Sequence, residues 1–354
     1  MNQFYKLYKR GINLGGWISQ YSESAEKAGD PHFENFIKES DIAQIASFGL
    51  DHVRLPVDYM IFEQDDNPGV YDEAGLVYID RCLEWCKKNK INLLLEMHHA
   101  PGYSFAGGSG NRLFDDPKQQ QRFIDQWTFF TKRYIDERDN MAFELLNEVY
   151  DKDSTRWNAL AARTVAAIRE IDKERFIMIG GNMYGNPSCL KEINIIPDDD
   201  RIIYAFHYYD PLLFTHQFAN WISFCHIMQK AEAYPTTITG ISEFLKIHPE
   251  FESDPNVTNY IDKRIDYDHM RELLQPCIDF IKQTGKPLHC SEFGVIEVAD
   301  IESRIRWHKD FYSILDEFEI GYSVWNYKLM NFSFVDENSE VVSKELFELT
   351  AGKK

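Results

Sequence analysis

The chain has 354 residues, 44% of them hydrophobic and 14% aromatic, and it carries a formal net charge of −19. This is enough apolar material for one large α/β domain or two smaller ones. The acidic balance argues against nucleic acid and anionic membrane surfaces as partners, because both would be repelled, whereas a neutral polysaccharide meets no such objection.

The first residues, MNQFYKLYKR, lack the apolar region of a secretion leader, and no apolar run approaches the roughly 20 residues of a membrane span. We therefore expect a cytoplasmic protein or a mature secreted form without its leader. The six cysteines form no CxxC cluster. Cys82 and Cys86 lie on the apolar face of a predicted helix, which is typical of ordinary core thiols.

Short apolar runs recur along the chain and predict eight strands. They cover residues 11–14, 52–56, 91–99, 141–148, 176–181, 202–209, 287–294 and 320–327. Their near-continuous hydrophobicity is typical of parallel strands that are buried on both faces.

Longer amphipathic segments between the runs predict helices. They cover residues 33–49, 73–90, 118–138, 154–174 and 303–318. Strands alternating with helices predict a (β/α)8 TIM barrel. A doubly wound open sheet is the alternative, although no G-x-G-x-x-G follows the first strand.

One connection is far longer than a usual βα loop. Residues 210–268 follow the sixth run and contain two partly amphipathic stretches, whereas ordinary βα loops have about 2–6 residues. We interpret residues 1–354 as a single catalytic domain, with a helical subdomain inserted at about 210–268 over the C-terminal face of the barrel.

Polar side chains cluster at the carboxyl ends of the apolar runs. They are Arg54, His98, His99, Asn147, Glu148, His207, Tyr209, Glu292, Trp325 and Asn326. In a barrel these ends converge on one mouth, so the agreement between strands favours an active site there.

Glu148 and Glu292 are the two carboxylates of this set that suit glycosidic bond cleavage. One must be protonated to serve the leaving oxygen, and the other must be ionised to attack the anomeric carbon. A cation at Arg54 would keep Glu292 ionised.

The remaining polar positions have roles that fit a sugar site. Asn147 is placed to bind a sugar 2-hydroxyl, Tyr209 to orient the nucleophile, and Trp325 to offer a flat face to a pyranose ring. Trp221, inside the insertion, is either a core residue or a sugar platform.

Other residues have structural interpretations. Glu144 lies mid-strand, where we expect a buried ion pair. His52 and His289 are expected to be structural, and Lys328 to be an exposed charge. A different class of function is a metal-dependent hydrolase, with a zinc site formed by His98, His99, His207 and a carboxylate. The chain contains no HExxH, and we expect no cofactor.

The motifs GINLGGW, DHVRLPVDY, EMHHAPG, FELLNEV, HYYDP, CSEFG and SVWNYK occur in this order between residues 11 and 328. Together they resemble glycoside hydrolase family 5, a family of (β/α)8 glycosidases. The resemblance implies retaining hydrolysis of β-linked glycans, with Glu148 as the acid/base and Glu292 as the nucleophile. It implies substrate-site positions for Arg54, His98, Asn147, His207, Tyr209 and Trp325, and less directly for His99. Many relatives have Pro where this chain has Val149.

We therefore expect a monomeric endo-β-1,4-glucanase that acts on cellulose-type and mixed-linkage β-glucans. The alternatives within the family are a lichenase, a mannanase or glucomannanase, a xylanase and an exo-glucosidase. A catalytically dead carbohydrate-binding barrel is the remaining class, and the presence of both glutamates speaks against it.

Overall fold

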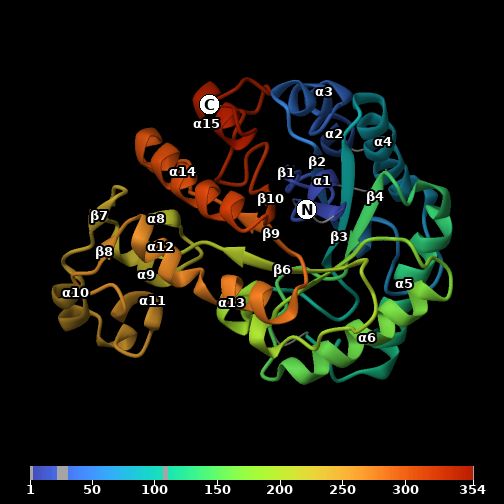
Figure 1. The fold of residues 1–354 in the computed structure, drawn as a ribbon, viewed down its shortest axis with the longest axis horizontal. Helices are drawn as coiled ribbons and strands as arrows, with labels where there is room; N and C mark the ends of the chain where they lie inside the picture. Colours follow the sequence, from blue (N-terminus) through green and yellow to red (C-terminus); the bar gives the residue numbers. More distant parts are fainter. Residues whose placement is uncertain (1–2, 22–30, 107–110, 354) are drawn as a thin grey trace.

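Eight parallel strands close into a barrel in the computed structural model, which describes residues 3–21, 31–106 and 111–353 (Figure 1). Around the barrel the strands follow the order β1-β10-β9-β6-β5-β4-β3-β2. They are β1 (Arg10–Asn13), β2 (His52–Asp58), β3 (Asn92–His99), β4 (Met141–Glu144), β5 (Ile177–Gly180), β6 (Ile202–Tyr208), β9 (Leu288–Phe293) and β10 (Gly321–Val324). The predicted (β/α)8 barrel is confirmed, and the open doubly wound sheet is wrong because β1 pairs with β10.

Helices surround the barrel, as Figure 1 shows. The long ones are α3 (Glu39–Phe48), α4 (Glu73–Asn89), α5 (Pro117–Arg133), α6 (Ser154–Arg169), α13 (Gln275–Thr284) and α14 (Ile301–Glu317). Aspartates cap the first turns of α4, α5 and α6, where each side chain accepts a backbone N–H. Cys82 and Cys86 are buried free thiols on α4, as predicted.

Two helical predictions were incomplete. The segment 33–49 forms two helices, α2 (Pro31–Asn35) and α3, because the backbone N–H of Lys38 donates to Asp41 at 2.7 Å and starts a new helix there. The sequence analysis missed α12 (Tyr267–Leu273) and α13, whose apolar pattern is interrupted by Pro276 in the first turn of α13.

The segment between β6 and β9 lies beside the barrel, at the left of Figure 1. Before α12 and α13 it contains only short elements: α8 (Leu212–Thr215), α9 (Ser223–Met228), β7 (Thr236–Thr237), α10 (Ile241–Ile247), η4 (Pro249–Phe251), α11 (Pro255–Thr258) and β8 (Arg264–Ile265). β7 and β8 pair with each other as a separate antiparallel sheet.

The N-terminal helix α1 (Gln3–Leu7) adds a small second core to the main one. Phe4 stacks on Tyr8 with ring centroids 4.6 Å apart, and both pack with apolar side chains of β3 to β6. The remaining short elements are η1 (Tyr59–Ile61), η2 (Ile135–Glu137), α7 (Asn182–Gly185), η3 (Pro187–Glu192) and α15 (Lys344–Thr350). Within the described ranges, no helix is both long and apolar enough to traverse a bilayer.

Candidate active site

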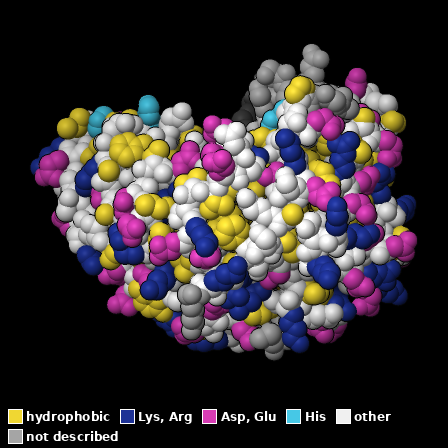
Figure 2. All heavy atoms as spheres, turned by 90° about the horizontal axis from the view of Figure 1, so that it is seen from above, with side chains coloured by type: hydrophobic (Ala, Val, Ile, Leu, Met, Phe, Trp, Pro, Cys, Tyr) yellow, Lys and Arg dark blue, Asp and Glu magenta, His cyan; other side chains and the backbone are white. Residues whose placement is uncertain are grey.

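A cleft of about 1180 Å³ opens at the carboxyl ends of the barrel strands. Every predicted site residue lines it except Arg54, which lies beneath its floor and is fully buried. Figure 2 shows the surface hollowed between two lobes, the left one on the side where Figure 1 places α10 and α11. The predicted site residues that line the cleft therefore do meet at one mouth of the barrel.

The loop that carries Glu148 begins earlier than the sequence indicated. The strand predicted over 141–148 ends at Glu144, since β4 covers only Met141–Glu144. Beyond it, the backbone N–H of Asn147 donates to the carbonyl of Met97 at 2.9 Å, which keeps the chain beside β3. Glu148 has a φ of 41°, an uncommon conformation for a residue with a side chain and a recognised form of strain at functional sites.

Tyr103 fixes this loop from the other side. Its hydroxyl donates to the carbonyl of Glu148 at 2.7 Å and accepts from the N–H of Tyr150 at 2.7 Å. Val149, between them, is buried in the core. The conformation of Glu148 is thus held by hydrogen bonds and packing, without a Pro at position 149.

Glu148 and Glu292 face each other across the cleft. One oxygen of each carboxylate and one ring nitrogen of His207 all lie within 4.8 Å of one another. Such proximity matches the short separation of the two carboxyl groups in retaining glycosidases, about 5–5.5 Å, and is well below that of inverting enzymes.

The environment of Glu148 favours a protonated carboxyl group at neutral pH. Burial raises the pKa of Glu148 to about 7, and Arg54 opposes this only in part. Nδ1 of His207 lies 3.2 Å from Oε1 of Glu148. Burial lowers the pKa of His207, so the ring is neutral and acts as a hydrogen-bonding group rather than as a cation.

Glu292 has partners that stabilise its charged form. Tyr209 donates its hydroxyl to Oε1 at 2.7 Å, and Nη1 of Arg54 lies 3.2 Å from Oε2. Burial raises the pKa of Glu292, and the charge on Glu148 adds to this rise, whereas Arg54 and the hydrogen bond from Tyr209 lower it.

The two carboxylates are therefore unequal. Two like charges this close disfavour double ionisation, so the pair retains one proton over a range of pH. Arg54 and Tyr209 donate to Glu292 but not to Glu148, so the shared proton resides on Glu148. The roles of Glu148 as the acid and Glu292 as the nucleophile stay a prediction of the sequence analysis at this point.

Arg54 lies beneath the site and contacts several of its polar side chains. It binds Glu144 through Nε at 2.6 Å and Nη2 at 3.3 Å, and lies 3.5 Å from Glu96. The buried ion pair predicted for Glu144 is confirmed. Nη2 of Arg54 also donates to Oδ1 of Asn147 at 2.9 Å. Because that oxygen is occupied, the amide NH2 of Asn147 is the group left to meet a sugar hydroxyl.

The histidines at the end of β3 do not form the alternative metal site. Nδ1 of His98 lies 3.0 Å from Glu96, and Nδ1 of His99 lies 2.6 Å from Asp58. Among the described residues, the group whose ligand atoms could meet at one metal ion is Glu148, His207 and Glu292, without His98 or His99. The two histidines instead line the cleft wall with their rings fixed by carboxylates.

The two tryptophans occupy different parts of the cleft. Trp325 is buried at the floor, with its ring parallel to that of His98 at a centroid distance of 5.9 Å. The ring covers Gly15 so closely that a Cβ there would lie 2.1 Å from it, which explains why glycine is needed. Trp221 is 51% exposed and lines the cleft, so of its two interpretations core packing is wrong.

Two residues of the last strand region differ from expectation. Lys328 is buried rather than exposed, and its Nζ donates to the carbonyl of Phe36 at 2.8 Å. Asn326 is fully buried and bonds to the backbone of Gly15, so it does not project into the cleft. His52 and His289 are structural as expected, since both contact the hydroxyl of Ser323.

Several cleft residues were missed by the sequence analysis. Phe105, Met330 and Phe332 come from loops, and Met183 and Tyr184 come from the four-residue α7. None of these segments has a periodic pattern that marks a side chain as facing the cleft. Glu96, which positions His98, carried a usable signal. The two residues are separated by one position on β3, so their side chains point to the same face.

Comparison with known proteins agrees with this geometry. A sequence profile described as cellulase, glycosyl hydrolase family 5, matches residues 17–331. The chain is 50% identical to endoglucanase C of Acetivibrio thermocellus over 347 residues, which are 98% of this chain and 99% of that protein.

The chain is also similar to proteins of lower sequence identity. Cellodextrinase A of Ruminococcus flavefaciens is 36% identical over 302 residues, which are 85% of this chain and 80% of that protein. The crystal structure of endoglucanase Cel5A from Thermotoga maritima superposes with a TM-score of 0.78 at 23% identity, covering 98% of this chain and 99% of that one.

Proposed function

The chain belongs to the cellulases of glycosyl hydrolase family 5, and on this premise we propose that Glu148 and Glu292 cleave internal β-1,4 bonds of β-glucan by double displacement. The protein is a glycoside hydrolase, an endo-β-1,4-glucanase. The mannan, xylan and exo-glucosidase alternatives are not favoured by the relatives, and neither is the metal-dependent one. The observation that carries the residue assignment is the short distance between two carboxylates whose partners differ.

In the first step the carboxylate of Glu292 attacks the anomeric carbon. The bond from that carbon to the leaving sugar oxygen breaks, and the proton of Glu148 moves to this oxygen. Hydrogen bonds from Arg54 and Tyr209 keep the nucleophile Glu292 ionised, and burial keeps the acid Glu148 protonated.

In the second step Glu148 is a carboxylate and takes a proton from water. The water oxygen attacks the anomeric carbon, and Glu292 leaves as a carboxylate, which restores the starting protonation states. Asn147 donates to a hydroxyl of the reacting sugar, and Trp325 supports the face of its ring.

The substrate is a β-glucan, as the endoglucanase relatives imply, and the aromatic and amide side chains that line the cleft suit a neutral sugar chain. We expect His98, His99, His207 and Trp221 to contact it. The cleft is built from one chain, so we expect the monomer to be active. We treat the whole chain as one catalytic domain with residues 210–268 as an insertion that contributes Trp221 to the cleft wall.

The experiment that tests the mechanism is proton NMR of the products of cellohexaose during the first minutes of hydrolysis. The newly formed reducing ends should be in the β configuration, as two successive inversions require. Release of α-configured ends would contradict double displacement. Release of glucose from one end of the chain alone would contradict endo action.

A further inference from the structure

Two tyrosines form an exposed ridge at the edge of the cleft, and the mechanism above does not use them. The rings of Tyr150 and Tyr184 stack with centroids 4.8 Å apart and an interplanar angle of 20°. They are 44% and 42% exposed, and Met183 beside them is 45% exposed. Large apolar side chains rarely gather at the surface without a partner.

The backbone holds these side chains outward. Met183 and Tyr184 have φ values of 52° and 59°, in the left-handed region that residues with side chains seldom adopt. The N–H of Tyr184 donates to the carbonyl of Val149 at 3.0 Å, and the N–H of Tyr150 donates to Tyr103. The ridge is therefore tied to the same loop that positions Glu148.

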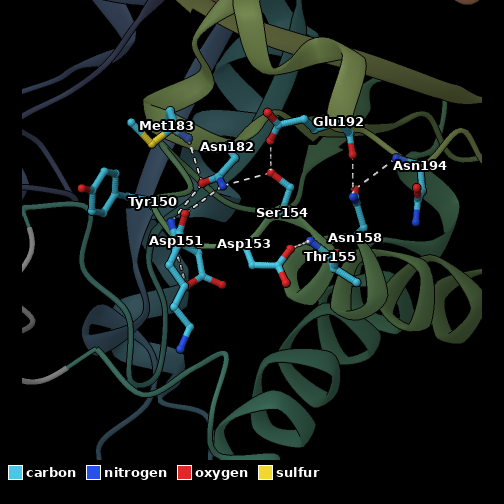
Figure 3. A pocket seen from close by; sticks show the side chains of 11 residues that line it. Tyr150, Asp151, Asp153, Ser154, Thr155, Asn158, Asn182, Met183, Glu192 and Asn194 are labelled. Atoms are coloured by element: carbon cyan, nitrogen blue, oxygen red, sulfur yellow. Dashed lines mark hydrogen bonds between the residues drawn. The ribbon is translucent and has the colours of Figure 1, made fainter.

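A second hollow, of about 490 Å³, begins on the far side of the ridge. Figure 3 shows Tyr150 and Met183 at one end of it and, along the rest, polar side chains from the β4–α6 loop, the start of α6, α7 and the end of η3. Met183 lines both this hollow and the cleft, and Tyr184 lines the cleft. The ridge thus joins two concave surfaces.

We propose that the Tyr150–Tyr184 ridge, at the edge of the catalytic cleft, is a sugar-binding platform for a glucose unit of the β-glucan chain beyond the units held at Glu148 and Glu292, and that the chain continues into the second hollow. This inference rests on the proposed function. A glucopyranose ring has a flat apolar face that suits a tyrosine face, and its hydroxyl groups at the ring edge suit amide and carboxylate walls. Asn194 and Glu192, both exposed, are such groups in the hollow.

The first test compares chain lengths. The ratio of kcat/KM on cellohexaose to kcat/KM on cellotriose should fall about fivefold in Tyr150→Ala and be retained in Tyr150→Trp, because Trp keeps a flat face. Ile247→Ala, at a position 74% exposed on α10, is the matched control and should leave the ratio unchanged.

Two outcomes of this test would overturn the proposal. An unchanged ratio in Tyr150→Ala would mean that no sugar contacts the ridge. An equal loss on both substrates would mean that Tyr150 only supports the loop of Glu148.

The second test does not need turnover. Calorimetric titration measures the affinity of Glu292→Gln and of Glu292→Gln/Tyr150→Ala for cellohexaose and for cellotriose. Adding Tyr150→Ala should lower the affinity for cellohexaose about fivefold more than the affinity for cellotriose. If the wild type cleaves no cello-oligosaccharide, the proposed function fails. If it cleaves them but affinity falls equally for both lengths, only the platform fails. If the wild type cleaves cellohexaose but Glu292→Gln does not bind it, the platform is again wrong and the proposed function stands.

Discussion

The hydroxyl of Tyr209 lies 2.7 Å from Oε1 of Glu292 and donates a hydrogen bond to it. This bond favours the charged carboxylate and opposes the rise in the pKa of Glu292 that burial causes. Tyr209 comes from the end of β6, where the pairing with β9 shifts register between Phe206 and His207. Such irregularities are common beside active sites.

Tyr209→Phe should raise the pKa of Glu292. Less of the nucleophile is then ionised at low pH, so the acid limb of the pH profile of kcat/KM should move to higher pH. The maximal rate should fall about tenfold, as expected for a lost hydrogen bond to a charged group. Tyr208→Phe is the matched control, because the buried hydroxyl of Tyr208 has no partner in the part of the chain that the structure describes. An acid limb that stays in place in Tyr209→Phe would contradict the assignment.

Glu148 should set the basic limb of the same profile. Its pKa is raised to about 7 by burial, so the acid loses its proton and kcat/KM declines as the pH rises through that value. Glu148→Gln should remove this limb for an aryl cellobioside with a good leaving group, which needs no protonation. On cellohexaose the same variant should lose about a thousandfold. A basic limb that persists in Glu148→Gln would show that another group carries it.

The raised pKa of Glu148 should also make the free energy of unfolding depend on pH. The folded protein holds this proton more tightly than the unfolded chain, so the associated stabilisation is complete below the ordinary glutamate pKa of 4.5 and is lost as the pH rises through about 7. Gln cannot ionise, so the unfolding free energy of Glu148→Gln relative to wild type should increase from pH 4 to pH 8, by up to about 3 kcal/mol. Urea denaturation at both pH values measures this. A difference between the two proteins that does not depend on pH would contradict it.

The sequence located the barrel and the site because both follow from repeated patterns. Apolar runs marked the strands, and polar residues at their carboxyl ends marked the mouth. Glu292 lies near the end of β9 and was found in this way, whereas β2 continues to Asp58, so Arg54 lies mid-strand beneath the mouth and not at the predicted strand end. Local backbone geometry was not visible, so β4 was predicted four residues too long and the conformation of Glu148 was missed.

Contacts between residues far apart in the chain could not be predicted from the sequence either. Lys328 comes directly after the apolar run 320–327, where a lysine resembles a surface residue, but the fold buries it against Phe36 and Asp41. The ridge of Tyr150 and Tyr184 depends on two loops that are 34 residues apart in sequence, since 184 − 150 = 34. Neither segment has a periodic hydrophobic pattern from which the contact between Tyr150 and Tyr184 could be predicted.

Arg54 and Glu144 should show strong energetic coupling. Arg54→Met leaves three buried carboxylates, Glu144, Glu96 and Glu292, without their shared cation and should cost about 3–5 kcal/mol of unfolding free energy. Adding Glu144→Gln removes one of these charges, so the double variant should be at least about 1 kcal/mol more stable than the sum of the single changes. Activity should not return, because Glu292 still lacks the cation that keeps it ionised. A double-mutant cycle in urea measures the coupling. Additive losses would mean that Arg54 stabilises the barrel through packing alone, and recovered activity would mean that Glu292 does not need the guanidinium.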